Sequence, residues 1–219
     1  MNAIYLSITI LLLLTNLSCS QDKEKINTYP EQKVIVGGGC EGCEAVYESP
    51  IPLEELNWID TLPDFNESGP KMEISGVIYK SDGVTPAPDV VLYIYHTDQN
   101  GYYSKKGGET GWGKRHGYIR GWVKTNENGE YKFYTLKPAP YPNGTDPAHI
   151  HPVIKEPAKN EYWIDEYVFE DDPKVNENYR NRVQNRGGSG IISLTANENG
   201  MLIGKRDLIL GKNVPDYPK

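Results

Sequence analysis

Two histidines separated by a single residue, in His149-Ile150-His151, have the spacing of a metal-ligand pair. Side chains alternate along a β-strand, so both imidazoles would point to the same face, with their backbone positions about 6 to 7 Å apart. Pro147 and Pro152 favour an extended backbone and predict a short or edge strand. The two rings could share one metal ion, although two solvent-exposed or hydrogen-bonded histidines would have the same spacing.

The histidines close a series of motifs with a fixed order along the chain. The series is Gly101-Tyr102-Tyr103-Ser104, the run from Gly129 to Pro138, Pro140-Tyr141-Pro142, and Pro147-Ala148-His149-Ile150-His151. This order resembles the intradiol ring-cleavage dioxygenases, a family that includes catechol and protocatechuate 3,4-dioxygenases. With 16 tyrosines against 3 phenylalanines, most tyrosines are expected to be half-buried structural residues, and the motifs single out only two.

The resemblance implies a non-haem Fe(III) cofactor held by two tyrosinates and two histidines. The matching positions are Tyr103, chosen over Tyr102, with Tyr141, His149 and His151. Phenolate is a hard, charged oxygen donor that suits Fe(III), and the metal in turn lowers the phenol pKa. The resemblance further implies that a catechol-type diol and O2 give a muconate-type diacid, while Tyr141 leaves the metal and accepts a proton.

Two positions depart from the family pattern and bear on catalysis. Asp146 stands directly before Pro-Ala-His, where the family usually has an arginine that stabilises the reacting substrate. Glu166 stands where the family often has a glutamine that orients substrate and oxygen. Both changes predict neutral catechols rather than acidic ones as substrates. Candidates for a replacement cation, which could equally be loop or strand-edge charges, are Arg115, His116 and Arg120.

Three other interpretations remain open. Residues 75–79, 89–93 and 125–131 also resemble transthyretin-like regulatory domains of carboxypeptidases and surface receptors, which bind partners without iron. A dioxygenase relative could bind iron and catechols without opening the ring. A zinc hydrolase could use the histidines with Asp146 or Glu166, but no general-base glutamate has a recognised spacing.

Short apolar or β-branched runs separated by turn residues predict an all-β fold, a two-sheet antiparallel β-sandwich. Asn126-Glu127-Asn128-Gly129 predicts a hairpin, and residues 170–188 predict a polar surface excursion with at most one short helix. The expected strands are residues 72–79, 89–96, 117–124, 130–136, 148–154, 162–169, 190–195 and 202–210.

The N-terminal region predicts export. The apolar run at residues 4–14 is too short to span a bilayer and indicates a signal peptide over residues 1–18. The sequence Leu17-Ser18-Cys19 resembles a bacterial lipobox, so Cys19 would carry a lipid, with a flexible tether at 19–33. We expect an outer-membrane or periplasmic lipoprotein, with plain secretion as the alternative.

The region after the tether divides into an extension at 34–70 and the sandwich at 71–219. Removing Cys19 leaves Cys40 and Cys43, an even number that suits a disulfide in an oxidising compartment, and no second Cys-x-x-Cys completes a zinc site. The net charge of -7 argues against nucleic acid as a partner, and contact with a membrane would be through the lipid alone. The expected partners are a small aromatic diol and O2, and a homodimer stays open.

Overall fold

Alternating burial along the strands divides apolar from polar side chains. In β2 (Lys71–Tyr79), Met72, Ile74, Gly76 and Ile78 are buried, while the residues between them are partly exposed. This period of two is what a strand with one face on a core requires. The structure is a computed structural model that describes residues 35–218.

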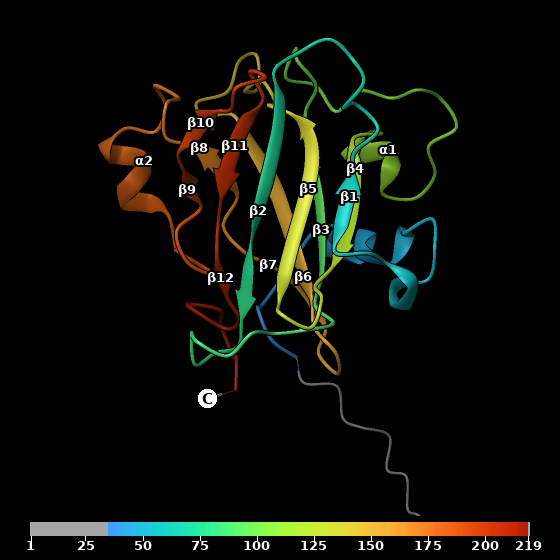
Figure 1. Cartoon of the computed structure of the whole chain (residues 1–219), viewed down its shortest axis with the longest axis vertical. Coiled ribbons are helices and arrows are strands. Elements are labelled where there is room, and N and C mark those ends of the chain that lie inside the picture. The colour runs from blue at the N-terminus through green and yellow to red at the C-terminus, as the bar shows by residue number, and fades with distance from the viewer. Residues whose placement is uncertain (1–34, 219) are drawn as a thin grey trace, which may run out of the picture. The chain divides into compact units, whose positions relative to one another are not determined.

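The predicted all-β fold is confirmed, as two six-stranded sheets facing each other (Figure 1). One sheet has the order β1-β5-β2-β11-β10, with β12 also paired to β2, and the other has β4-β3-β6-β8-β9, with β7 paired to β6. The strands besides β2 are β1 (Ile59–Thr61), β3 (Val91–His96), β4 (Arg120–Lys124), β5 (Glu130–Leu136), β6 (His149–Lys155), β7 (Glu161–Trp163), β8 (Tyr167–Phe169), β9 (Ile191–Ile192), β10 (Leu194–Ala196), β11 (Leu202–Lys205) and β12 (Leu208–Ile209).

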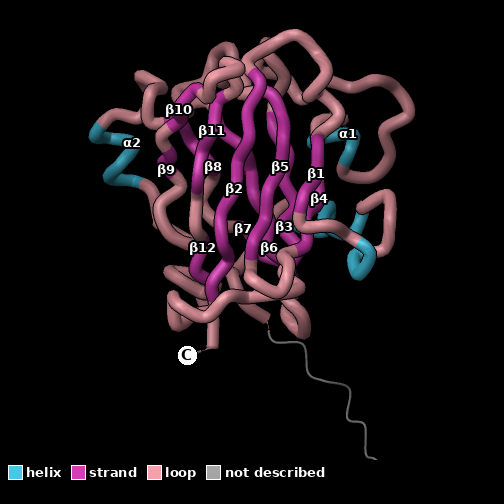
Figure 2. Tube along the Cα trace, in the orientation of Figure 1, coloured by secondary structure: helices cyan, strands magenta, loops and turns pink. Residues whose placement is uncertain are grey.

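Antiparallel pairing holds the centre of each sheet, through β2 with β5 and through β3 with β4 and β6. Parallel pairs add to this pattern: β1 with β5, β11 and β12 with β2, and β8 with β9. Helical segments are short and lie outside the sheets (Figure 2), namely η1 (Cys43–Glu48), η2 (Leu53–Glu55), α1 (Gly113–His116) and α2 (Glu177–Arg182). Residues 170–188 were predicted to hold at most one short helix, and α2 is the one found there.

Strand β3 of the second sheet is covered on both faces. Leu92 and Ile94 of β3 belong to the main core between the sheets. Val91 and Tyr93, on the opposite face of β3, pack against Ala45 and Val46 of η1. The region before the sandwich therefore covers part of the outer face of this sheet, and β1 extends the other sheet by pairing with β5.

Strand β6 corrects the expectation of a short edge strand, because β6 lies inside its sheet between β3 and β8. On one side, Pro152 is opposite Ile94 of β3. On the other side, β8 pairs with His149 and Ile150, and β7 pairs from Val153 onward. Pro152 falls in the gap between these two pairings, where a missing N–H breaks no ladder.

The run expected as one strand at residues 162–169 is divided into β7 and β8. The buried carboxylate of Asp165 lies in the gap and accepts hydrogen bonds from the backbone N–H groups of Asn185 and Arg186. A second interruption separates β11 from β12 at Arg206, whose buried guanidinium donates to the Asp165 carbonyl. Buried polar groups need such partners, and here they divide the strands.

Cys40 and Cys43 form a disulfide. The expected signal peptide at 1–18, Cys19 and the tether at 19–33 lie outside the described residues. None of the helices described is long and apolar enough to cross a membrane.

Candidate metal centre and its cavity

The two histidines of β6 project from the outer face of the second sheet, away from the core. Ile150, between them, is buried in the main core, as strand alternation requires. His149 and His151 are partly exposed, and their Nε2 atoms lie 3.0 Å apart with ring planes at 90°. The pair is therefore set by the strand, and both Nε2 atoms approach a common point.

Two loops bring the tyrosines to the same point. The Tyr103 and Tyr141 hydroxyl oxygens are 2.5 Å apart, and Tyr102 is 59% exposed outside the cluster. The loops touch at Gly101, where a Cβ atom would lie 2.2 Å from the Pro140 carbonyl oxygen. Gly101 also has φ of 81°, so only glycine fits both the backbone conformation and the close approach.

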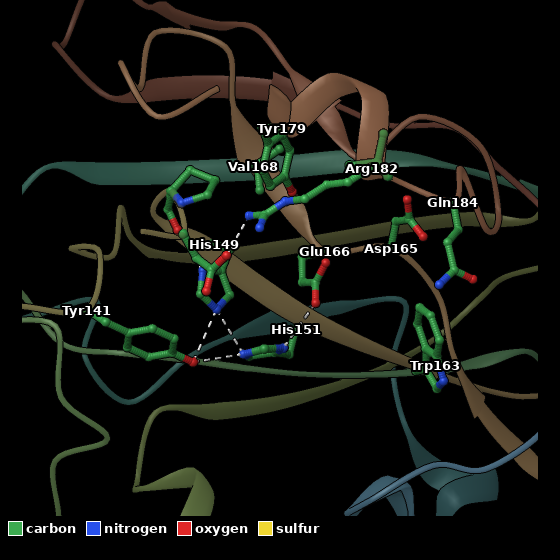
Figure 3. Close-up of a pocket in the computed structure, with 13 residues that line it drawn as sticks. Tyr141, His149, His151, Trp163, Asp165, Glu166, Val168, Tyr179, Arg182 and Gln184 are labelled. Atoms are coloured by element: carbon green, nitrogen blue, oxygen red, sulfur yellow. Dashed lines mark hydrogen bonds and ion pairs between the residues drawn. The ribbon is translucent and has the colours of Figure 1, made fainter. Parts of the chain in front are cut away.

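The four donor atoms form one cluster (Figure 3 shows three of these side chains). Tyr103 Oη is 2.8 Å from His151 Nε2, and Tyr141 Oη is 3.2 Å from His149 Nε2 and 3.3 Å from His151 Nε2. Ligands about 2.0 to 2.2 Å from one metal at right angles would be about 2.8 to 3.1 Å apart. The spacing and the mixture of phenol oxygen and imidazole nitrogen therefore fit a metal ion such as Fe(III).

The Nδ1 atoms of the two imidazoles face different neighbours, and among the described residues only His149 Nδ1 has a hydrogen bond. The Nδ1–H of His149 donates to the Pro147 carbonyl at 2.6 Å, which leaves Nε2 with its lone pair toward the cluster. His151 Nδ1 faces Glu166 Oε1 at 3.8 Å. Burial lowers the pKa of His151 well below its usual value, which favours the neutral, metal-binding form.

Burial has the opposite effect on the tyrosines. It raises the pKa of Tyr103, and the hydrogen bond to Tyr141 raises it further. It also raises the pKa of Tyr141, with smaller contributions in the same direction from Asp146 and Glu166. A phenolate at either position needs a bound cation to offset the cost of burial. The described residues contain no group of three or more His, Cys, Asp or Glu side chains that could hold a metal.

A cavity of about 340 Å³ lies beside the cluster. Tyr141, His149 and His151 line it, as do the three acidic residues Asp146, Asp165 and Glu166 and one arginine, Arg182. Two smaller cavities, of about 210 and 180 Å³, share His151 and are both lined by Glu41 and Tyr95. The residues around the disulfide thus form part of the wall of the site.

The candidate cations divide between the site and its surroundings. Arg115 and His116 line the 210 Å³ cavity, and Arg115 forms an ion pair with Glu41. The prediction that Arg120 supplies a cation to the pocket is wrong, because Arg120 lines none of these three cavities. Its Nη1 donates to Glu48 at 2.7 Å, and its guanidinium lies over the Trp122 ring.

Sequence reasoning did not identify Arg182, Tyr95 or Glu41 as site residues. Arg182 comes from α2, Tyr95 from β3 and Glu41 from the disulfide loop, and none of them is in the tyrosine and histidine motifs. The polar excursion at 170–188 indicated only a surface loop. Their place in the site depends on contacts between distant segments.

Comparison with known protein families shows to which family the chain belongs. A sequence model of the dioxygenase family matches residues 55–201, more than half of the chain. The chain belongs to the intradiol dioxygenase family. The matched segment contains all four candidate ligands, whereas the disulfide loop lies before it.

Solved structures of intradiol dioxygenases have the same fold. The dioxygenase domain of a carbohydrate-binding fusion protein from Streptomyces sp. SirexAA-E is 19% identical, with a TM-score of 0.53 over 69% of this chain and 88% of that one. 3-Chlorocatechol 1,2-dioxygenase from Rhodococcus opacus 1CP is 26% identical, with a TM-score of 0.54 over 69% of this chain and 64% of that one. Catechol 1,2-dioxygenase from Acinetobacter sp. ADP1 is 20% identical, with a TM-score of 0.54 over 70% and 57%. This intradiol dioxygenase relative spans less than two thirds of the latter two enzymes.

Proposed function

We propose that the protein is a non-haem Fe(III) dioxygenase that opens catechol-type aromatic diols with O2 by intradiol cleavage. The proposal depends on one observation, the meeting of two phenol oxygens and two imidazole Nε2 atoms beside a 340 Å³ cavity. That volume is at the small end of the range for ligand sites and suits a single aromatic ring. Both atoms of O2 would enter the product, a muconate-type diacid.

The four side chains that would hold the iron are Tyr103, Tyr141, His149 and His151. Bound Fe(III) would act as a Lewis acid toward the two hydroxyl groups of the diol and promote attack of O2 on the ring. Tyr141 lines the cavity, and its Oη would accept a proton from the incoming diol. Because burial raises the pKa of this phenol, the Tyr141 phenolate would be a strong base toward the diol.

The other interpretations have less support. A transthyretin-like binding module needs neither the tyrosine pair nor the histidine pair, and the chain belongs to the dioxygenase family. A zinc hydrolase would need a carboxylate beside the two Nε2 atoms, but Asp146 forms an ion pair with Arg182 and Glu166 faces Nδ1 of His151 instead. A relative that binds iron and catechol without turnover would share every feature of the site. Only an experiment can distinguish it from an active dioxygenase.

The test begins with the visible spectrum and metal content of protein purified from iron-supplemented cells. We expect a tyrosinate-to-Fe(III) band that shifts when catechol is added under argon. When O2 is then admitted, the protein should consume it and convert the catechol into a ring-opened diacid. His149→Ala should lose the iron, and full iron occupancy in that variant would contradict the ligand assignment.

The remaining outcomes have distinct meanings. A colourless, iron-free wild-type protein would overturn the proposal. A band that shifts with catechol but leads to no oxygen uptake would identify an inactive, catechol-binding relative.

We further propose that the protein is exported and anchored by a lipid on Cys19, on the strength of the lipobox-like sequence. Radiolabelled palmitate should enter the wild-type protein in cells, and Cys19→Ser should remain unlabelled and leave the membrane fraction. Equal labelling of both proteins would contradict this assignment.

A further inference from the structure

Three acidic residues and one arginine line the 340 Å³ cavity. Asp165 is buried and turns its carboxylate to two backbone N–H groups, those of Asn185 and Arg186. The charges left to act on a ligand are those of Asp146, Glu166 and Arg182. Arg182 is thus the one positive side chain that this cavity contains among the described residues.

Arg182 is held at the cavity by one carboxylate. Its Nη2 donates to Asp146 Oδ1 at 2.6 Å, and its guanidinium lies 5.0 Å from the centre of the Tyr179 ring. Figure 3 shows its side chain extending from α2 toward His149. A guanidinium has five N–H donors, so a single bond to Asp146 leaves donors for a ligand.

The segment that carries Arg182 is fastened to the loop before His149. Lys174 Nζ donates to the Gly144 and Asp146 carbonyls, and the Asp172 carboxylate accepts the Ala148 N–H at 2.8 Å. These bonds join the segment before α2 to the residues that lead directly into the histidine pair. The backbone that carries Arg182 is therefore fixed relative to His149, and the ion pair with Asp146 positions its half-exposed side chain.

We propose that Arg182 is the substrate-facing cation of this site and that Asp146 restrains it, so that the pair and Glu166 together select diols without an acidic ring substituent. The inference rests on the proposed dioxygenase function. Asp146 carries a charge opposite to that of Arg182 and forms an ion pair with it, while Glu166 adds a further negative charge to the cavity. A ring carboxylate would meet that negative charge, whereas the oxygens of a bound diol can accept hydrogen bonds from Arg182.

The experiment measures the binding of two diols to the Fe(III) protein under argon, where no ring cleavage can occur. The probes are catechol and 3,4-dihydroxybenzoate, and the visible spectrum gives each Kd. In wild-type protein we expect catechol to bind more tightly. Arg182→Gln should weaken both and raise the ratio of the dihydroxybenzoate Kd to the catechol Kd about three- to tenfold.

Asp146→Asn should change the ratio in the opposite direction, because it removes a negative charge and frees the guanidinium. Arg182→Lys keeps the positive charge, so its ratio of the two Kd values should stay close to that of wild-type protein. The matched control is Arg180→Gln. Arg180 lies on the same helix but does not line the cavity, and its guanidinium is 3.6 Å from the Glu170 carboxylate. This variant should leave both Kd values unchanged.

Unfolding of the variants is checked by circular dichroism. If wild-type protein binds both diols but neither Arg182→Gln nor Asp146→Asn changes the ratio, the inference is overturned and the proposed function stands. If wild-type protein shows no response to either diol, the proposed function fails and the inference fails with it.

Discussion

Tyr95 stacks on His151, with ring centroids 4.6 Å apart and planes 17° apart. The other face of Tyr95 stacks on His116, with centroids 3.8 Å apart and planes 5° apart. A candidate ligand is therefore supported by a row of rings that begins on α1 and crosses β3. The row fixes the plane of His151, and so the direction of its Nε2 lone pair.

Replacing Tyr95 tests this support. Tyr95→Leu should weaken iron binding about tenfold, because outer contacts that orient a ligand typically contribute that much or more. Tyr95→Phe keeps the stacked ring and should bind iron as wild-type does. Competition with a chelator measures both affinities. Equal iron affinity in the leucine variant would show that β6 alone orients His151.

The two neighbouring tyrosines of the Gly101 loop provide a matched pair. Tyr103→Phe should lose about half of the tyrosinate-to-iron absorption, since one of two phenolates is removed. Tyr102→Phe should leave the spectrum unchanged, because Tyr102 is exposed and outside the cluster. Visible spectra of the iron-loaded proteins decide the matter. The reverse result would exchange the two assignments.

Gly101 predicts a cost for separating the tyrosine loops. Gly101→Ala should destabilise the protein by about 2 to 4 kcal/mol, from backbone strain plus the clash with the Pro140 carbonyl, and should reduce the iron colour. Gly107→Ala is the control, because Gly107 also has positive φ, of 93°, but has no atom within 4 Å of the added Cβ. It should cost about 1 to 2 kcal/mol and keep the colour. Urea unfolding gives both values, and equal losses would exclude the clash.

His116 predicts acid sensitivity. Burial, with Arg120 and Arg115 nearby and Glu48 opposing them, lowers its pKa from 6.5 to about 4. Between these two pH values the unfolded chain takes up a proton that the folded chain excludes, so stability falls as the pH falls through this window. At pH 5 this group should account for a loss of about 2 kcal/mol relative to pH 7.

The measurement is urea unfolding of iron-free protein at pH 7 and pH 5, for wild type and for His116→Gln. Buried His96 also has a lowered pKa and contributes with the same sign in both proteins. The difference between the two proteins therefore isolates His116. An equal pH dependence in the two would show that His116 is protonated in the folded state.

Much of the fold follows from local pattern. Alternation and turn residues placed β2, β3, β5 and β6 close to their observed bounds, because one face of each strand must meet the core. The hairpin predicted at residues 126–129 is wrong, because β4 and β5 lie in different sheets. The pattern also failed where buried polar groups interrupt a strand, at Asp165 and Arg206. Their partners come from distant segments, so no local signal marks the break.

Local sequence was enough to predict which residues compose the candidate site. Strand alternation puts His149 and His151 on one face, and the motifs single out Tyr103 and Tyr141. The residues around them could not be predicted in this way. Arg120 pairs with Glu48, and Arg182 lines the cavity beside Asp146. Glu41 of the disulfide loop lines the two smaller cavities. Spacing along a strand is fixed by backbone geometry, whereas charge pairing across a cavity depends on how separate segments pack.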